Sequence, residues 1–362
     1  MKGFASELER VVGLPWRLLA RLKSSGAVRE MWKRGGMRLL MPVYVAGLRV
    51  KNRHAVVFNE KVKYKIARDR RPILTSFSDK LDARRYVSRV VGPGYVPEVL
   101  AEARCAADLP WADFPQEMAI KTNHGSGACV LVWNGAEPSS RVPEPRVENA
   151  WSTSIVHPSA ADPLALSAFL DMNLKLNYYW LYGEWGYRHV RPRAFAEECL
   201  VGSDGRRPLD YRFYVFNGIC EALLVISEIE TDSITADFFL PDWTHLRATR
   251  GGYPNGPVTP RPPAELPEML EIAGTLGLET DFVRVDFMLT GGRILVGELT
   301  NYPNAGRVPA SPPDFDRWLG SHWNPPGNYR KLPQGSYPCG DRIGHQGSAG
   351  GGGGGIRTLE AP

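Results

Sequence analysis

The segment Asp281-Phe-Val-Arg-Val-Asp-Phe-Met-Leu-Thr-Gly-Gly-Arg-Ile-Leu-Val-Gly-Glu-Leu-Thr300 carries the strongest structural signal in the chain. It is typical of two strands joined around a glycine pair. Side chains alternate between the two faces of a strand, so polarity indicates the pairing register. A three-residue loop at 291–293 sets Asp286 opposite Glu298 and keeps the apolar side chains on the other face. A two-residue turn would set Glu298 opposite Val285, so we expect the three-residue loop.

This register has a chemical consequence. Two carboxylates directly opposite each other on a sheet repel unless a cation lies between them. Carboxylate oxygens, completed by water and phosphate oxygens, suit Mg²⁺. The same register sets Arg284 opposite Thr300, where the guanidinium can hold a phosphate or an acyl phosphate. The segment alone leaves open a surface hairpin whose charges face solvent.

A second segment, Ile120-Lys-Thr-Asn-His-Gly-Ser-Gly127, puts Lys121 at the end of a strand before a loop of small residues. Backbone N–H groups in such a loop can form a nest for phosphate oxygens. The loop joins two strands and lacks both the Walker pattern and GxGxxG, so it is not that of a P-loop nucleotidase or a Rossmann domain. Taken alone, a plain hairpin turn is the simpler interpretation. For His124 we favour a hydrogen-bonding role over that of a nucleophile or base.

A third segment, Glu197-Glu198-Cys199-Leu200, closes a strand. An acidic side chain and exposed backbone groups there could recognise the amino group of adenine. A strand end with solvated carboxylates is the simpler interpretation of this segment by itself.

The rest of the chain predicts a mixture of helices and strands. Helical patterns cover 1–45, 79–91 with Ser78 as N-cap, 164–179 and 266–276, strands cover 117–121, 128–133, 195–200, 211–216, 219–226, 282–289 and 294–299, and loops cover 136–163 and 254–267.

These pieces follow the order found in the ATP-grasp superfamily, and the chain most closely resembles its TupA-like (teichuronopeptide-biosynthesis-type) family. The likeness runs from about residue 55 to 325, and the strings KTNHGSG and VRVD…GELT are specific in combination. The matching stretches are Phe58-Asn-Glu-Lys61, Asp79-Lys80, Ile120–Gly127, Gly183-Glu-Trp185, Pro192-Arg193, Ala196-Glu-Glu198, Asp210-Tyr-Arg-Phe213, Phe216-Asn-Gly218, Phe282-Val-Arg-Val-Asp286 and Gly297-Glu-Leu-Thr300.

The resemblance implies an α+β ATP-grasp fold in which two lobes with mostly antiparallel sheets clamp ATP. It implies Mg²⁺, or Mn²⁺ in its place, between the γ-phosphate and the carboxylates. The implied chemistry is activation of a carboxylate to an acyl phosphate, followed by attack of an amine. The implied site consists of catalytic Arg284 and Arg212, nucleotide-binding Lys80, Lys121, His124, Gly125, Ser126, Gly127, Glu197, Glu198 and Leu200, and metal-binding Asp286, Glu298 and Thr300.

Two positions depart from the patterns that the resemblance brings. Many ATP-grasp enzymes have Asn two residues after the metal-binding Glu, whereas this chain has Thr300, as the closer family also tends to have, followed by Asn301. The closer family usually continues with a glycine-serine-glycine turn, whereas this chain has Asn304-Ala-Gly306 and then Arg307. We expect that turn to border the acceptor site and the substrate to differ accordingly.

Charge is unevenly distributed along the chain. Residues 1–53 hold 12 lysines and arginines and three acidic residues, which is +9, so the remainder must sum to −4 to give the net charge of +5. A nucleic-acid-binding protein is expected to carry its basic footprint on the folded face that does the work, so we exclude a nucleic acid as partner. For residues 37–50 we favour packing on the core or a contact with a partner protein over binding to a membrane surface.

The five cysteines are scattered and form no CxxC pair, which argues against a zinc site or a disulfide framework and suits a reducing compartment. We therefore expect a cytoplasmic protein, with a peripheral contact at the inner face of the membrane left open. No apolar run approaches the ~20 residues that span a bilayer.

The predicted organisation has five parts. They are a basic helical extension (1–55), a helical and linker region (56–115), a small ATP-grasp lobe with the glycine loop (116–195), a C-terminal lobe with the metal hairpin (196–330) and a disordered Gly-rich tail (331–362).

The function we favour is an ATP-dependent carboxylate–amine ligase acting on a small or polymer-linked carboxylate in surface-polymer or natural-product biosynthesis. An ATP-grasp kinase or phosphotransferase would share the same nucleotide and metal residues. A non-catalytic module that docks on an anionic surface through residues 1–53 would bind no nucleotide and would depend strongly on salt. A glycosyltransferase is a further alternative, although no residue cluster distinguishes a sugar-nucleotide site.

Overall fold

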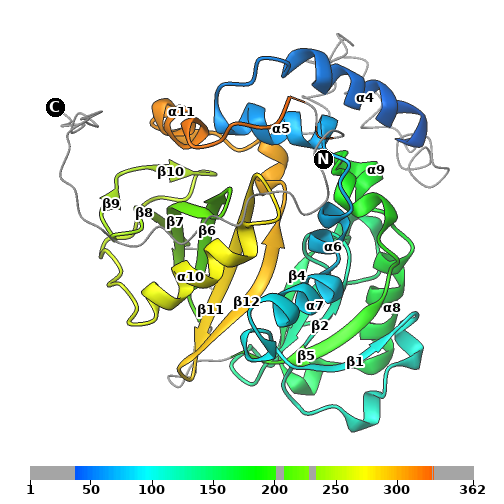
Figure 1. Ribbon diagram of the computed structural model, residues 1–362. Helices are drawn as coiled ribbons and strands as arrows, with labels where there is room; N and C mark the ends of the chain where they lie inside the picture. The colour runs from blue at the N-terminus through cyan, green and yellow to red at the C-terminus, as the bar shows by residue number, and fades with distance from the viewer. Residues whose placement is uncertain (1–36, 201–207, 228–233, 328, 330–362) are drawn as a thin grey trace.

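The computed structural model describes residues 37–200, 208–227, 234–327 and 329, which form an α+β fold built on two main sheets (Figure 1). One sheet has five strands in the order β1-β5-β2-β3-β4, antiparallel except for the parallel pair β3 and β4. These strands are β1 Val99–Ala103, β2 Met118–Thr122, β3 Cys129–Val132, β4 Thr153–Val156 and β5 Ala194–Glu198.

The second sheet is antiparallel throughout and has six strands in the order β12-β11-β6-β7-β8-β9. A separate two-stranded sheet pairs β10 with β13. These strands are β6 Asp210–Phe216, β7 Ile219–Ser227, β8 Thr235–Phe239, β9 His245–Leu246, β10 Thr249–Arg250, β11 Val283–Thr290, β12 Arg293–Thr300 and β13 Ala310–Ser311.

Helices cover the sheets and join them. Helix α10 packs on β6, β7 and β11, and α8 packs on β2, whereas α6 and α7 contact β12 and lie between the two sheets (Figure 1). The helices are α4 Met37–Lys51, α5 Phe58–Arg68, α6 Ile73–Ser78, α7 Lys80–Val90, α8 Pro163–Leu174, α9 Tyr179–Tyr182, α10 Leu266–Gly277 and α11 Pro313–Ser321.

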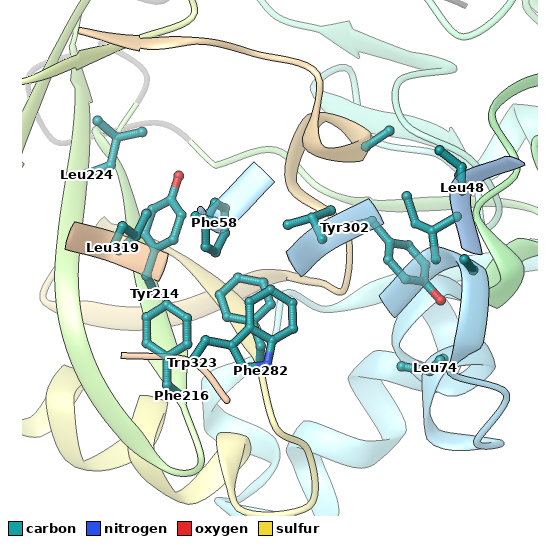
Figure 2. Close-up of a cluster of buried hydrophobic side chains, with 14 of the residues drawn as sticks. Leu48, Phe58, Leu74, Tyr214, Phe216, Leu224, Phe282, Tyr302, Leu319 and Trp323 are labelled. Atoms are coloured by element: carbon teal, nitrogen blue, oxygen red, sulfur yellow. The ribbon is translucent and has the colours of Figure 1, made fainter. Parts of the chain in front are cut away.

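The largest core lies where α4, α5 and α11 meet the six-stranded sheet. Phe58 of α5 is fully buried, and its ring meets those of Phe282 at 5.2 Å and Tyr214 at 5.7 Å, in edge-to-face geometry (Figure 2). Helix α4 buries Met41 and Leu48 in the same core, so the predicted packing of this segment on the core is confirmed. No helix among the described residues is long and apolar enough to cross a membrane.

The hairpin of β11 and β12 has the predicted register at its functional end but reaches it differently. Asp286 pairs with Glu298, as expected. The predicted three-residue loop is wrong, because residues 290 and 293 pair directly and leave a two-residue turn at 291–292 with positive φ at both glycines. The register then shifts in β12 beyond Asp286, so that Gly297 is the extra residue of a bulge. The bulge returns Glu298 to the polar face.

Three other predictions need correction. The N-cap of α7 is Asp79 rather than Ser78, because the Asp79 carboxylate accepts hydrogen bonds from two backbone N–H groups of the first turn. The boundary predicted between residues 195 and 196 falls inside β5, which pairs with β1 and β2 in the five-stranded sheet. The predicted loop 136–163 contains β4. Residues 1–36 and the predicted tail, 331–362, lie outside the described residues.

Candidate functional site

Lys80 lies at the first turn of α7 and is bound to the glycine loop. Its backbone N–H donates to the carbonyl of Asn123 at 2.8 Å, and its Nζ donates to the carbonyl of Gly125 at 2.5 Å. Burial lowers the pKa of Lys80, Glu298 opposes this shift, and Lys121 adds to it. The two predicted nucleotide lysines therefore lie near each other and near a hairpin carboxylate.

The glycine loop is shaped by Trp151, which the sequence did not single out. A Cβ on Gly127 would lie 1.7 Å from the carbonyl oxygen of Trp151, and one on Gly125 would lie 2.5 Å from its ring. Both glycines also have positive φ, of +85° and +86°, which side chains disfavour. Ser126 lies exposed at the tip between them. The loop thus needs glycine for close packing as well as for backbone conformation.

His124 is buried and anchors this loop. Its Nε2 lies 3.1 Å from the carbonyl oxygen of Leu176, and its ring meets that of Trp151 edge-to-face at 5.0 Å. Burial lowers the pKa of His124 to about 4, so the imidazole is neutral near pH 7. The geometry agrees with the hydrogen-bonding role favoured from sequence, and a direct contact with nucleotide stays a prediction.

Glu197 is the centre of a buried ion-pair triad. It is 2% exposed and forms ion pairs with Lys121 of β2 and Arg84 of α7. Burial alone would raise the pKa of Glu197, but Lys121 and Arg84 outweigh that effect and hold it below its usual range. These ion pairs therefore position Lys121 and join the five-stranded sheet to α7. No pattern in the sequence pointed to Arg84, which lies within an otherwise ordinary helix.

The next residues of that strand lie at the contact between the lobes. Glu198 forms a bidentate ion pair with Arg293 of β12, at 2.8 and 2.9 Å, and also accepts from the backbone N–H of Glu98. Leu200 follows, half-buried, at the end of the described stretch that stops at residue 200. Recognition of adenine by this segment stays a prediction.

The polar face of the hairpin carries the predicted metal residues and arginines together. Arg284 donates to both oxygens of Asp286, at 2.7 and 2.5 Å, and to the hydroxyl of Thr300 at 3.1 Å. Arg212 of β6 pairs with Asp210, and its Nε lies 3.9 Å from Asp286. Burial raises the pKa of Asp286 to about 6, against the opposing effect of Arg284.

Glu298 connects this face to the lysines. Burial favours its neutral form, but Lys80, followed by Arg284, outweighs that effect and lowers the pKa of Glu298. The neighbouring Thr300 side chain also lowers the pKa of Glu298. Asn301, in contrast, lies on the opposite side of the strand, where its amide donates to the backbone of Leu74 and to the hydroxyl of α6's last residue. Of the two neighbours, Thr300 is the one on the carboxylate face.

These residues suit a magnesium ion. Each carboxylate oxygen has a second lone pair, so Asp286 can bind Arg284 and a cation together. Mg²⁺ commonly takes one or two carboxylates and completes its shell with phosphate and water oxygens. In the ranges that the structure describes, no group of three or more His, Cys, Asp and Glu side chains gathers to hold a metal. Asp286 and Glu298, which lie directly opposite each other on the hairpin, supply two carboxylates of this kind.

Two surface clefts lie beside this cluster rather than in it. One, of about 660 Å³, is lined in part by Arg84, Glu98 and Arg293, and the other, of about 740 Å³, by Asp79 and Arg193 among others. Neither is lined by the lysine of β2 or the hairpin carboxylates. The candidate site is thus defined by converging charges on α7, β2, β11 and β12.

Comparison with known proteins identifies the family of this chain. A family model described as TupA-like ATPgrasp matches residues 60–324. The chain belongs to the TupA-like ATP-grasp family. No curated protein matches it.

Solved structures similar to this TupA-like ATP-grasp protein include D-alanine–D-alanine ligase from Bacillus anthracis complexed with ATP. The two are 16% identical, the match covers 64% of this chain and 57% of that chain, and the TM-score is 0.35. The ATP-grasp ligase PsnB complexed with its minimal precursor is 15% identical, with coverage of 82% and 74% and a TM-score of 0.39. An L-amino acid ligase from Bacillus licheniformis is 12% identical, with coverage of 74% and 54% and a TM-score of 0.38.

Proposed function

We propose that this protein is an ATP-dependent ligase that joins a carboxylate to an amine through an acyl phosphate. Membership of the ATP-grasp family supports the use of ATP. The observation that carries the proposal is the convergence of charges at Glu298. Lys80 of α7 is its strongest cationic neighbour and Arg284 its next, and Lys121 acts on Lys80 in turn. Such a set of cations beside two carboxylates suits a nucleoside triphosphate with a divalent ion.

The residues divide into three roles in this proposal. Lys80 and Lys121 neutralise phosphate oxygens, and Glu197 holds Lys121 in position. Asp286 and Glu298, with the Thr300 hydroxyl, would hold Mg²⁺ or Mn²⁺. The bound ion supplies neutralisation of the charge that develops on the transferred phosphoryl group.

The arginines stabilise negative charge on the substrate. The side chain of Arg212 is 28% exposed and that of Arg284 is 8% exposed, so Arg212 is the more accessible of the two. A carboxylate oxygen of the substrate attacks the γ-phosphorus and ADP leaves. The amine nitrogen then attacks the acyl carbon, the C–O bond to phosphate breaks, phosphate departs and the nitrogen loses a proton. In this proposal, Arg212 stabilises the oxyanion at the second step.

The setting follows from the chemistry. A ligase that consumes ATP works where ATP is available, so we place it in the cytoplasm. Its substrates would be a small or polymer-linked carboxylate and an amine acceptor, in the biosynthesis of a surface polymer or a related natural product.

Mg-ATP binding is the first test. A ligand at 100 times its Kd, binding only the folded state, stabilises by about 2.7 kcal/mol, which a thermal-shift assay detects. We expect Mg-ATP to raise the melting temperature of the wild type, and EDTA or Glu298→Gln to remove the metal-dependent part. Glu144→Gln is the matched control, because that side chain is 63% exposed in a surface ion pair. Absence of any nucleotide effect on the wild type would favour the non-catalytic module.

The reaction products separate the ligase from the kinase. We would incubate the protein with Mg-ATP and a panel of amino acids and other carboxylates, with hydroxylamine as a small nucleophile that traps acyl phosphates. A ligase gives ADP, free phosphate and a hydroxamate. Stable transfer of phosphate to the panel compound, followed by ³¹P NMR, would support the kinase instead.

A further inference from the structure

The larger surface cleft, of about 740 Å³, is lined by none of the residues proposed to bind nucleotide or metal. Its volume lies within the range of about 300–1,000 Å³ that small-molecule sites occupy. Its wall is formed by α6, by the start of α7, and by the segments that follow β1 and precede β5. The charged side chains that line it are Asp79, Asp82, Arg104, Arg191 and Arg193.

The two acidic side chains of the cleft already have partners. Asp79 is 3% exposed, accepts hydrogen bonds from two backbone N–H groups of α7, and lies 3.3 Å from the guanidinium of Arg193. Asp82 pairs with Arg85 and lies 3.5 Å from Arg193. Arg193 is also paired with Glu102, at 3.3 Å. Backbone donors and arginines therefore satisfy both carboxylates, and these pairs fix the side chain of Arg193.

The other two arginines of the cleft are exposed and come from neighbouring strands. Arg104 directly follows β1, and Arg191 lies three residues before β5, so the antiparallel pairing of these strands brings both to the same end of the five-stranded sheet. In the part of the chain that the structure describes, neither side chain forms an ion pair, a hydrogen bond or a ring contact. Thr75 and His189 add hydrogen-bonding groups to the same lining. Because its three arginines outnumber its two aspartates, the cleft favours an anion.

The wall of the cleft is joined to the glycine loop by hydrogen bonds. The side-chain amide of Asn123, which is fully buried, donates to the carbonyl of Arg191 at 3.0 Å and accepts from the backbone N–H of Arg193 at 2.8 Å. The backbone N–H of Asn123 donates to the carbonyl of Arg193 at 2.9 Å, and its carbonyl accepts from the backbone N–H of Lys80 at 2.8 Å. These bonds fix the backbone that carries Arg191, so binding of an anion requires little further ordering of the chain.

We propose that this cleft is a binding site for a small organic dianion, in which Arg104 and Arg191 each hold one acidic group. The inference goes beyond the proposed ligase activity and does not depend on it. The planar N–H donors of a guanidinium match the paired oxygens of a carboxylate or a phosphate. Two such groups on separate segments favour a ligand with two anionic ends. The volume corresponds to about 25 water molecules at ~30 Å³ each, which is more than a single acetate or phosphate ion fills.

The test is isothermal titration calorimetry of the full-length protein at constant ionic strength, with and without saturating Mg-AMPPNP. The probes are the dicarboxylates succinate and glutarate, the phosphorylated carboxylate 3-phosphoglycerate, and acetate as the monoanion. We expect at least one of the first three to bind the wild type tenfold or more tightly than acetate. Their relative affinities distinguish a dicarboxylate ligand from a phosphorylated one.

Single substitutions locate the bound probe. Arg104→Gln and Arg191→Gln should each weaken its binding tenfold or more. Arg146→Gln is the matched control, because it removes one positive charge from a side chain that is 69% exposed and does not line the cleft. This control should leave the affinity unchanged.

Each contrary result has a definite meaning. Failure of every dianionic probe to bind the wild type would overturn the inference, as would equal binding to the wild type and to both cleft variants. Equal weakening in Arg146→Gln would show a general effect of charge, and loss of binding in the presence of Mg-AMPPNP would place the probe in the nucleotide site; either result contradicts the proposal. Neither cleft arginine has a partner among the described residues, so both variants should keep the melting temperature of the wild type, and a large decrease in both would indicate a structural role instead.

Discussion

The ion-pair triad at Glu197 allows a sharp test of how α7 is held to the five-stranded sheet. The substitution Glu197→Gln keeps the size of the side chain but removes its charge. Its side chain is 2% exposed, and those of its partners are 7% exposed for Arg84 and 20% for Lys121. Removing one member of a buried ion pair costs about 3–5 kcal/mol, because the remaining charge stays buried. Lys121 keeps some access to solvent, so we expect a loss of about 3 kcal/mol.

The neighbouring residue provides the control. Glu198 lies on the same strand, but its side chain is 24% exposed and its partner Arg293 is 48% exposed. Exposed pairs contribute about 0–1 kcal/mol, so Glu198→Gln should lower the free energy of unfolding by no more than that. Both variants and the wild type would be unfolded in guanidinium chloride at pH 7, with tryptophan fluorescence as the signal. Equal and small losses in the two variants would refute the reasoning.

The pH dependence of this difference has a defined sign. The pKa of Glu197 is lowered in the folded protein, because its two cationic partners outweigh burial. The contribution of Glu197 to the free energy of unfolding is therefore fully present above its pKa in the unfolded chain, about 4.3, and is lost as pH falls through its pKa in the folded protein. The stability gap between wild type and Glu197→Gln should shrink on acidification below about pH 4.

Three further predictions concern the loop and the core. Gly127→Ala should unfold or severely destabilise the protein, because its Cβ would lie 1.7 Å from the Trp151 carbonyl oxygen. Gly292→Ala is the control, because a Cβ there meets open space and only the φ of +74° is unfavourable. It should lower the free energy of unfolding by about 1–2 kcal/mol in the same denaturation assay. Burial lowers the pKa of His124 from 6.5 to about 4. As pH falls from 6.5 to 4, the imidazole therefore takes up a proton in the unfolded chain before it does so in the folded protein, and the wild type loses stability. His124→Gln should reduce that loss by up to about 3 kcal/mol, measured as the unfolding free energy at pH 7 and pH 4.5. Asp281 is buried with two cations and two aromatic hydrogen-bond donors. Asp281→Asn should therefore lower the free energy of unfolding by about 3–5 kcal/mol in denaturant titrations. A loss below about 1 kcal/mol would contradict a stabilising network.

Sequence reasoning located the hairpin because strand alternation is a local property. The pairing of Asp286 with Glu298 follows from keeping polar and apolar side chains on separate faces, and the structure has that pairing. The loop was mistaken because two devices give the same register. A three-residue turn and a two-residue turn with a bulge at Gly297 both add one residue, and glycine suits either.

Contacts between distant segments could not be predicted in this way. Arg84 and Glu197 are 113 residues apart, and Trp151 reaches the glycine loop from the segment before β4. Arg191 carried no signal in the sequence, and nothing there showed that it would line a cleft together with Arg104. Such pairings depend on how the helices dock between the sheets.

The sequence by itself thus determined the local elements and the face on which each hairpin residue lies, since alternation, turn residues and apolar spacing act over a few positions. The tertiary structure alone decided which charges neutralise one another: Lys121 with Glu197, Lys80 beside Glu298, and Arg193 with Asp79. The physical reason is that electrostatic pairing and desolvation depend on distances through space and on burial, which chain order does not specify.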